Sequence, residues 1–257
     1  MDKLNFLTAG VPLRAEGKGY EVGFKVLGDM NLDGLELEFV RGVRISDKSR
    51  EAVGNSKKVI TAHAPFYVNL NAREEEKVEA STQRIIETAE VANELGGYSI
   101  TYHAAYYLGM EAELVYKQVA KQTQIIVDAL AKTNNKIWIR PETTGKATQW
   151  GDLAEIVRLS KEFEQVLPCV DFSHLHARYN GIVNTYDEFS EIFETIGNEL
   201  GQVALDNFHA HVAGIEYGAK GEKKHLNLEE SDFNYKDLLK AFKAFDVKGA
   251  VVCESPN

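Results

Sequence analysis

The sequence predicts an α/β protein of the (β/α)8 TIM-barrel type, and three observations support this fold class. Eight short apolar segments with strand-like composition recur along the 257 residues. Segments with helical periodicity separate most neighbouring pairs, and such alternation is typical of a parallel sheet. The length also fits, because a barrel of eight units usually needs about 250 residues. A doubly wound open sheet in two halves is the alternative, and the eight units favour the barrel.

The first half of the chain contains four strand candidates and three predicted helices. The strand candidates are apolar or alternating runs at residues 4–9, 35–40, 57–62 and 98–102. Apolar residues at helix-like intervals predict a helix over 20–30. Residues 74–95 are rich in glutamate and alanine with a period of about 3.6 residues, so they form a predicted helix that Gly96 and Gly97 end. Residues 111–132 form a second long amphipathic helix.

The second half continues the alternation. Its strand candidates are residues 136–140, 166–170 with Asp171 at the end, 203–211, and 249–253 with Glu254 at the end. Its predicted helices are residues 152–163, 186–196 and 235–245. Asp152 is a suitable N-cap for the first of these helices, and Ser231 or Asp232 for the last.

No linker or low-complexity segment interrupts the pattern, so we expect one TIM-barrel domain over residues 1–257. The sequence ends three residues after Glu254, and no helix follows the last strand. The predicted barrel would therefore lack its final outer helix.

Composition limits the classes of function. The formal net charge of −10 argues against indiscriminate nucleic-acid binding but is compatible with a local basic rim. No run approaches the roughly 18 apolar residues of a membrane-spanning helix, and no signal peptide precedes the first strand, so we expect no membrane partner. Cys169 and Cys253 lie in apolar runs and are expected to be reduced core thiols, which fits a cytoplasmic protein.

The histidines carry the strongest functional signal, because active sites of TIM barrels lie at the C-terminal ends of the strands. All seven lie at or just beyond such an end, and none is expected on a helix: His63, His103, His174, His176, His209, His211 and His225. Glu142, Asp171 and Glu254 lie at the ends of three strands as well. Histidine and carboxylate ligands without cysteine are typical of catalytic zinc, manganese or iron sites. The sequence therefore predicts a metal site, with enough carboxylates to bridge more than one ion.

Three positions stay open. His176 is either a residue behind the ligands or an exposed one. His209 and His211 point to the same face of their strand, and His211 is preferred because it lies closer to the strand end. The run from Lys220 to His225 is either a solvated loop or a segment that closes an outer metal site through His225 and a nearby glutamate.

The order of these motifs resembles endonuclease IV, a zinc-dependent apurinic/apyrimidinic endonuclease family among the xylose-isomerase-like barrels. The similar motifs are His63-Ala-Pro, Tyr102-His103, Pro141-Glu142-Thr-Thr-Gly145, Asp171-Phe-Ser-His174, His211, Lys224-His225-Leu-Asn-Leu228 and Cys253-Glu254-Ser-Pro256. They extend from the third strand to the end of the sequence. The resemblance implies two or three Zn²⁺ ions per chain, with Mn²⁺ or Mg²⁺ as alternatives.

The resemblance also implies how the inner ligands divide between ions. Glu142 would bridge two inner ions, and His63 and His103 would complete the first. The second would be completed by Asp171, His211 and Glu254.

A third ion would lie further out. The resemblance implies that His174 and His225 hold it, together with an acidic residue two positions before His225. Lys223 occupies that position here, which is a departure from the family pattern. Glu222 is the candidate substitute; otherwise the third site is weak or absent.

The implied activity is cleavage of the phosphodiester bond 5′ to abasic sites in duplex DNA, a step of base-excision repair, by a chain that we expect to be a monomer. A water molecule shared by two cations has its pKa lowered enough to supply hydroxide near neutral pH. Glu142 or Glu254 would accept or orient its proton.

DNA contacts are implied for loops around the strand ends. Arg41 follows the second strand, and Phe66 lies at the offset from His63 where the family has an intercalating tyrosine, with Tyr67 next to it. Packing of Phe66 and Tyr67 over the barrel mouth is equally consistent with the sequence. Further basic residues expected on this face are Arg44, Lys48, Arg50, Lys146, Arg178, Lys220, Lys223 and Lys224.

The main alternative is a metal-dependent sugar or sugar-phosphate isomerase or epimerase on the same barrel. The net charge of −10 favours it. The additional ligand pair His174 and His225 and the basic loops favour the nuclease. A barrel that only binds or stores metal has little support, because open ligation of the catalytic type would serve no purpose there.

Overall fold

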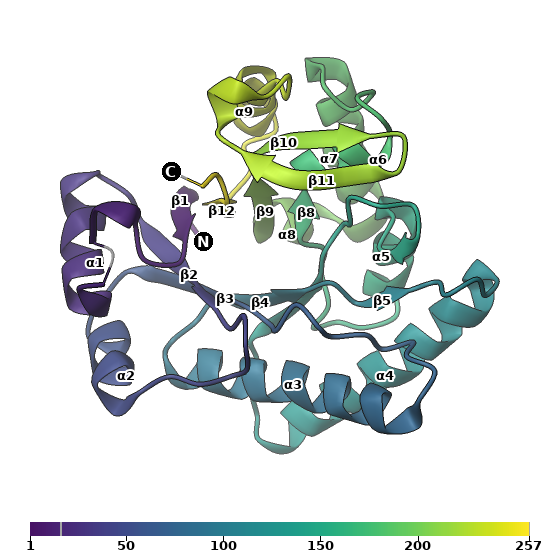
Figure 1. The fold of residues 1–257 in the computed structure, drawn as a ribbon, viewed down its shortest axis with the longest axis horizontal. Helices are drawn as coiled ribbons and strands as arrows, with labels where there is room; N and C mark the ends of the chain where they lie inside the picture. The colour runs from purple at the N-terminus through teal and green to yellow at the C-terminus, as the bar shows by residue number, and fades with distance from the viewer. Residues whose placement is uncertain (16, 257) are drawn as a thin grey trace.

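The structure is a computed structural model that describes residues 1–15 and 17–256 (Figure 1). Its centre is a curled sheet of eight parallel strands in the order β6-β4-β3-β2-β1-β12-β9-β8. The strands are β1 (Leu4–Ala9), β2 (Gly34–Glu38), β3 (Val59–His63), β4 (Ser99–Tyr102), β6 (Trp138–Pro141), β8 (Val170–Asp171), β9 (Phe208–Val212) and β12 (Gly249–Cys253). This confirms the predicted parallel α/β fold of the TIM-barrel type.

The two edges of the sheet meet at an irregular seam between β6 and the segment before β8. Isolated parallel bridges join Ile139 to Val166 and Glu142 to Cys169. The amide of Cys169 also donates to the carbonyl of Pro141 at 3.0 Å. Glu142 therefore lies at the seam, where main-chain pairing on both sides fixes its backbone.

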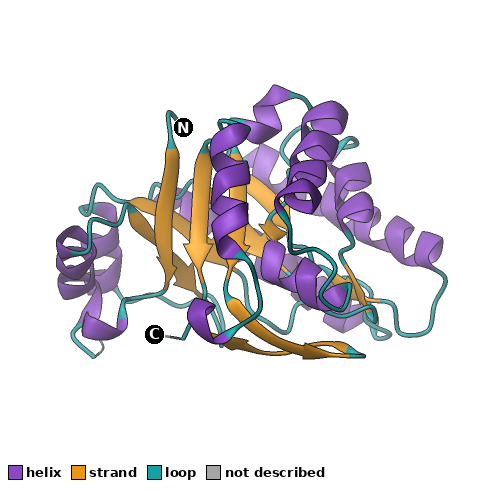
Figure 2. Ribbon diagram, turned by 90° about the horizontal axis from the view of Figure 1, so that it is seen from above, coloured by secondary structure: helices purple, strands orange, loops and turns teal. Residues whose placement is uncertain are grey.

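Helices lie outside the curled sheet (Figures 1 and 2). They are α1 (Gly19–Asp29), α2 (Asp47–Gly54), α3 (Glu75–Glu94), α4 (Ala112–Lys132), α5 (Leu153–Ser160), α6 (Phe172–Arg178), α7 (Tyr186–Leu200), α8 (Gln202–Leu205) and α9 (Tyr235–Ala244), with short 3-10 turns at Leu13–Ala15 and Leu228–Glu230. None of the described residues follows β12 in a helix, as predicted. Among the residues described, the helices include none with the length and apolarity needed to cross a membrane.

The main hydrophobic core lies between the strands and the surrounding helices. On β2, Leu35 and Leu37 are fully buried in this core. Side chains alternate along a strand, so Glu36 and Glu38 face the barrel interior. Glu36 is also fully buried and accepts a hydrogen bond from the Thr61 hydroxyl at 2.7 Å. The interior of this barrel is thus polar where the site lies.

Most predicted elements are confirmed, and two strand predictions are corrected. The strand expected over 166–170 pairs regularly only at β8, and Pro168 in that segment has no amide hydrogen for a ladder. Residues 203–205, expected in a strand, belong to α8. The N-cap of α9 is Asn234, which accepts from the Asp237 amide at 3.2 Å, and not Ser231 or Asp232.

The prediction that no histidine lies on a helix is wrong. Helix α6 begins directly after β8 and carries both His174 and His176. Asp171 is its N-cap, and its Oδ1 accepts from the His174 amide at 2.7 Å. An aspartate directly before a helix, whose side chain can accept from the amide three residues later, is an N-cap signal, and the strand-end interpretation overlooked it.

An antiparallel hairpin, β10 (Gly214–Gly218) and β11 (Gly221–Leu226), follows β9 and was not predicted. Figure 2 shows it lying across the C-terminal ends of the strands. A smaller pair, β5 (Ala105–Tyr106) and β7 (Gln149–Trp150), joins two loops at the same end of the sheet. The run Glu222-Lys-Lys-His225 lacks apolar alternation, so the sequence gives no strand signal there.

The first prediction concerns Gly34, which begins β2. A Cβ at this position would lie 1.8 Å from the Val59 carbonyl oxygen on β3. Because that oxygen is backbone of a paired strand, we expect Gly34→Ala to lower the free energy of unfolding by roughly 3 kcal/mol, as in severe overpacking. Urea unfolding measures the change.

Gly28→Ala is the matched control, because a Cβ on Gly28 in α1 meets nothing within 4 Å. Alanine in a helix interior should raise stability by up to about 1 kcal/mol. Equal unfolding midpoints for the two variants would contradict the assigned β2–β3 register.

Candidate metal centre

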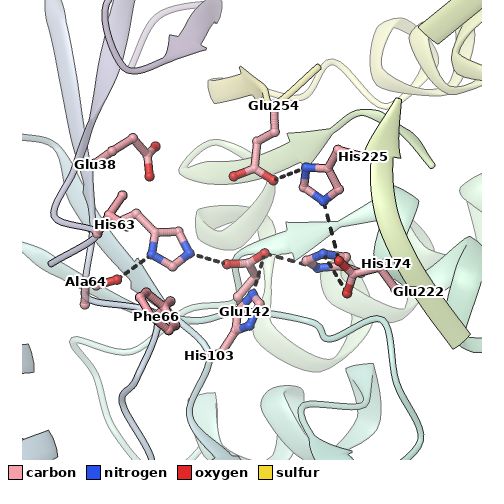
Figure 3. Close-up of a pocket in the computed structure, with 11 residues that line it drawn as sticks. Glu38, His63, Ala64, Phe66, His103, Glu142, His174, Glu222, His225 and Glu254 are labelled. Atoms are coloured by element: carbon pink, nitrogen blue, oxygen red, sulfur yellow. Dashed lines mark hydrogen bonds and ion pairs between the residues drawn. The ribbon is translucent and has the colours of Figure 1, made fainter. Parts of the chain in front are cut away.

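The strand ends surround a pocket of about 220 Å³ (Figure 3). Its lining includes carboxylates and histidines from β2, β3, β11 and α6 and from the residues just after β4, β6 and β12: Glu38, His63, His103, Glu142, His174, Glu222, His225 and Glu254. Charged groups rarely gather in a buried site unless they are paired or bind a cation. The geometry of each group decides between these possibilities.

Glu142 is the central carboxylate and is almost completely buried. Its Oε2 lies 3.1 Å from His63 Nε2, and its Oε1 lies 3.3 Å from His103 Nε2 and 3.3 Å from His211 Nδ1. Burial acts to raise the pKa of the Glu142 carboxyl, but the charges of His103 and His211 outweigh it and hold this pKa well below its ordinary value. Glu142 is therefore an anion shared by several histidines.

The Nδ1 atom of His63 lies 2.7 Å from the Ala64 carbonyl oxygen. This contact directs Nε2 into the pocket, toward Glu142 (Figure 3). His63, His103 and Glu142 each offer a ligand atom within 4.8 Å of the others. This is the set expected around the first inner ion.

A second set contains Glu142, Asp171, His211 and Glu254, again with ligand atoms within 4.8 Å of one another. The buried atoms Glu142 Oε1, Asp171 Oδ2 and His211 Nδ1 have no hydrogen-bond partner. Buried polar atoms without partners are rare, so their convergence is what a bound cation would explain. The two oxygens of Asp171 have different surroundings: Oδ1 caps α6, and Oδ2 faces this set.

The third set lies toward the hairpin and contains Asp171, His174 and His225. His174 Nδ1 lies 3.0 Å from the Thr143 carbonyl oxygen, which leaves Nε2 directed outward. That Nε2 lies 3.6 Å from Glu222 Oε2, and His225 Nε2 lies 3.9 Å from Glu222 Oε1. The rings of His174 and His225 and the Glu222 carboxylate therefore face one another.

Glu222 faces this outer set, and Lys223 does not. Lys223 Nζ lies 3.3 Å from Glu216 Oε1, on the other side of the hairpin. The Glu222 amide donates to the Gly145 carbonyl at 2.9 Å, which docks the hairpin on the loop after β6. A Cβ on Gly145 would lie 2.7 Å from Glu222 Cβ. Asp171 is the carboxylate within 4.8 Å of both histidines, and Glu222, which faces the two rings at 3.6 and 3.9 Å, is the candidate for a further acidic ligand.

His211 is held from below by Glu36, whose Oε1 lies 3.0 Å from His211 Nε2. A carboxylate on one ring nitrogen orients the other toward a metal. His209 lies deeper: its Nε2 is 3.2 Å from Glu36 Oε2, and its Nδ1 is 2.8 Å from the Ser99 hydroxyl. Burial lowers the pKa of His209 to about 4. The geometry thus favours His211 over His209 as the ligand.

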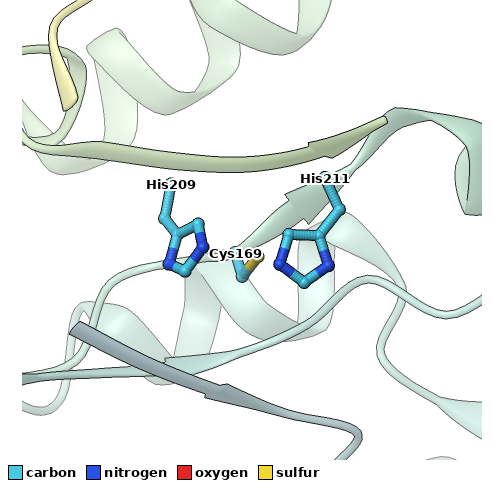
Figure 4. A group of neighbouring side chains, drawn as sticks. All are labelled: Cys169, His209 and His211. Atoms are coloured by element: carbon cyan, nitrogen blue, oxygen red, sulfur yellow. The ribbon is translucent and has the colours of Figure 1, made fainter. Parts of the chain in front are cut away.

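Cys169 lies beside His209 and His211, and the three groups are close enough to share an ion (Figure 4). Burial raises the pKa of the Cys169 thiol to about 12. Because only a thiolate binds zinc well, a thiol that keeps its proton is a poor ligand. This cluster is better explained as packing beneath the metal centre.

The sequence interpretation missed two interior carboxylates, Glu36 and Glu38. Burial raises the pKa of Glu38 to about 7, with a further contribution from the charge of Glu36. The alternation Leu-Glu-Leu-Glu over β2 was the available signal, because a strand with one buried face should not place glutamates on its inner face without a role.

Residues expected to contact DNA lie at the edge of the pocket or outside it. Phe66 is 64% exposed and Tyr67 40%, and their rings meet edge to face with centroids 5.3 Å apart. Arg41 is exposed. This exposure is compatible with DNA contact, which stays a prediction.

Two basic residues are not placed as expected. Arg178 is buried on α6, where its Nη1 donates to the Lys146 and Gln149 carbonyls at 2.6 and 3.1 Å. It holds the loop after β6 and does not face solvent as a phosphate contact would. Arg50 lies on α2 and pairs with Glu94 on α3 at 2.5 Å.

His176 lies inside the protein and does not line the pocket. It is fully buried on α6, with Nε2 3.1 Å from Asp232 Oδ1 and Nδ1 3.1 Å from the Val183 carbonyl oxygen. Both ring nitrogens have protein partners. His176 therefore lies outside all three ligand sets.

The chain matches the family described as a xylose isomerase-like TIM barrel over residues 24–257. An uncharacterized protein of Methanocaldococcus jannaschii is 48% identical over 256 residues, which cover 98% of this chain and 92% of the relative. A probable endonuclease 4 of Aquifex aeolicus is 23% identical over 202 residues, which cover 74% of this chain and 68% of the relative.

Solved structures of two kinds are similar in fold. A D-tagatose 3-epimerase-like protein has a TM-score of 0.75 at 17% identity, covering 98% of this chain and 91% of its own. Endonuclease IV from Thermus thermophilus has a TM-score of 0.70 at 18% identity, covering 98% of this chain and 93% of its own. These likenesses show the fold and fit both a nuclease and an epimerase.

The second prediction concerns the outer set. We expect Gly145→Ala to displace Glu222 and lower bound metal by about one ion per chain, because the added methyl would lie 2.7 Å from Glu222 Cβ. Metal analysis after dialysis against zinc measures the ratio. Gly218→Ala, at the end of β10, is the control, because its Cβ would meet only the flexible end of the Lys223 side chain, at 3.2 Å. An unchanged ratio in Gly145→Ala would count against Glu222 as a ligand.

The third prediction concerns pH. Burial acts to lower the pKa of His63, but the Glu142 carboxylate outweighs it and raises this pKa to about 10, so the ion-free ring is protonated near neutral pH. An ion must displace that proton, so zinc affinity should fall as the pH falls from about 8 to about 6. Calorimetric titrations in two buffers with different ionisation enthalpies should show proton release. Equal heats in both buffers would contradict it.

Proposed function

The chain belongs to the xylose isomerase-like TIM barrel family, and from that premise we propose that it is a zinc-dependent apurinic/apyrimidinic endonuclease. It would cleave the phosphodiester bond 5′ to abasic sites in duplex DNA. Family members include enzymes named as endonucleases and as epimerases. The observation that carries the proposal is the outer set of Asp171, His174 and His225, with Glu222 facing both rings, beside the two inner sets.

The residues present fit divalent cations. Each of the three sets offers histidine nitrogen together with carboxylate oxygen, the ligand types that zinc shares with manganese. Three sets within one pocket support two or three ions per chain. Zinc is proposed because histidine predominates, with Mn²⁺ or Mg²⁺ as alternatives.

When bound, such ions would supply positive charge to the phosphoryl oxygens and lower the pKa of a water molecule. Glu142, with its two oxygens directed to different histidines, would keep the inner ligands at a fixed separation. Glu254 lies at the pocket surface, with Oε1 3.4 Å from His211 Nδ1 and Oε2 3.9 Å from His225 Nδ1. Its carboxylate would orient the attacking water and accept its proton.

The size of the pocket supports a small extruded group as the part of the substrate that enters. Its volume of about 220 Å³ is below the roughly 300–1,000 Å³ usual for ligand pockets. An abasic sugar lacks the base and is easily turned out of the helix. Phe66 at the rim would fill the gap that the sugar leaves, and the exposed Arg41 would meet a phosphate.

A sugar or sugar-phosphate isomerase or epimerase is the second candidate. The similarity to a D-tagatose 3-epimerase-like protein and the net charge of −10 favour it. Such an enzyme needs one or two ions, so the outer set would have no function in it. Metal content separates the two: about three zinc ions support the nuclease, and one or two manganese or magnesium ions the isomerase.

The fourth prediction tests the proposed function. The zinc-loaded chain should nick a labelled duplex at a single abasic site, on the 5′ side. Glu142→Gln should reduce the rate by more than about 100-fold. Loss of a residue that only supports a metal ligand already costs about 10- to 100-fold, and Glu142 would itself be a bridging ligand. Circular dichroism should show that the variant stays folded.

Glu79→Gln, on the exposed surface of α3, is the control and should nick at the wild-type rate. Full activity in Glu142→Gln would refute the bridging role. A zinc-loaded wild type that leaves abasic DNA intact but interconverts an aldose and a ketose would replace the nuclease with the second candidate.

A further inference from the structure

Glu38 is the one carboxylate of the pocket that no cation or hydrogen-bond donor among the described residues contacts. It ends β2 in register with His63 on β3, so it lies in the same layer of the barrel mouth. Figure 3 shows its carboxylate directed into the pocket, between His63 and Glu254, with no interaction marked. Its Oε1 is a buried atom without a hydrogen-bond partner.

Glu38 is partly exposed as a residue, but a buried oxygen without a hydrogen-bond partner is rare, so a partner absent from the protein itself is expected for its Oε1. The partner could be a metal ion or a donor on the substrate. Glu38 shares a possible ion only with Glu36 and Glu254. Both of these already face other groups, since Glu36 lies against His209 and His211, and Glu254 belongs to the second inner set. A metal at Glu38 would therefore have no ligands of its own.

We propose that Glu38 is a specificity residue that accepts a hydrogen bond from the C1 hydroxyl of the abasic deoxyribose. The proposal rests on the proposed function. Glu38 lines the same pocket as the ligand sets, so a sugar that enters this pocket comes within reach of its carboxylate. The abasic sugar carries a hydroxyl at C1, where an intact nucleotide carries the base.

The contact would distinguish substrates in two ways. When Glu38 is ionised, at a pH above its pKa of about 7, a hydroxyl that donates to it strengthens binding of the abasic sugar, since hydrogen bonds to charged groups are the stronger kind. In an intact nucleotide, the base nitrogen that is bonded to C1 of the sugar has no proton to donate, so Glu38 would stay unpaired. A site built around an acceptor rejects a group that leaves it unsatisfied.

The test compares two duplexes that differ only at this hydroxyl. One contains a natural abasic site, and the other its tetrahydrofuran analogue, which lacks the C1 hydroxyl. The zinc-loaded wild type should favour the natural site by about tenfold in kcat/KM, the effect of one hydrogen bond to a charged group. Glu38→Ala should remove this preference, so that the ratio of kcat/KM for the natural site to kcat/KM for the analogue falls to about one. Glu38→Gln, which keeps an oxygen acceptor without the charge, should lie between them.

Two further measurements separate the outcomes. Metal content of Glu38→Ala should equal that of the wild type and of the control Glu79→Ala on exposed α3. A fall in metal content, or an equal loss of rate on both duplexes, would overturn the specificity role in favour of ligation or folding. A wild type that cleaves both duplexes equally well would overturn it too. A wild type that cleaves neither would refute the proposed function, and the role of Glu38 with it.

Discussion

The structure depends on the placement of six carboxylates at or beneath one pocket, three of them almost fully buried. They are Glu36, Glu38, Glu142, Asp171, Glu222 and Glu254. Like charges at these separations repel strongly, and the low local dielectric increases the repulsion. Arg140 does not offset them, because its guanidinium donates to the carbonyls of Pro168 and Asn207. The pKa values of His63, His174 and His211 are raised, so these histidines supply positive charge to the group, and the proposed cations would add to it.

The barrel supports this arrangement by dividing each strand between two environments. Leucines on the outer face of β2 join the hydrophobic core, while the glutamates between them enter the site. The seam at β6 and β8 adds main-chain contacts around Glu142 and Asp171, the two residues that belong to more than one ligand set. Stability of the fold and geometry of the site are therefore built from the same strands.

Much of the fold could be predicted from sequence because strands and helices alternate with distinct periods. The collection of histidines at strand ends likewise pointed to a metal centre. The start of α6 was missed because Asp171 serves both as strand end and as helix cap, and a one-residue boundary leaves no separating turn. The hairpin was missed because its second strand, β11, is mostly polar, and its first strand, β10, has only one fully buried apolar side chain, Ile215. The contact between Glu36 and His211 joins distant segments and could not be read from either one.

The hairpin has a thermodynamic consequence. It supplies Glu222 and His225 to the outer set, whereas His174 comes from α6 on the barrel itself. An ion held by all three would join two separate pieces of the chain. By linkage, docking of the hairpin strengthens binding of the ion by the same free energy by which the bound ion strengthens docking of the hairpin. The occupancy of the outer ion site and the protection of the hairpin amides from hydrogen exchange would then rise and fall together, because both would depend on the same equilibrium.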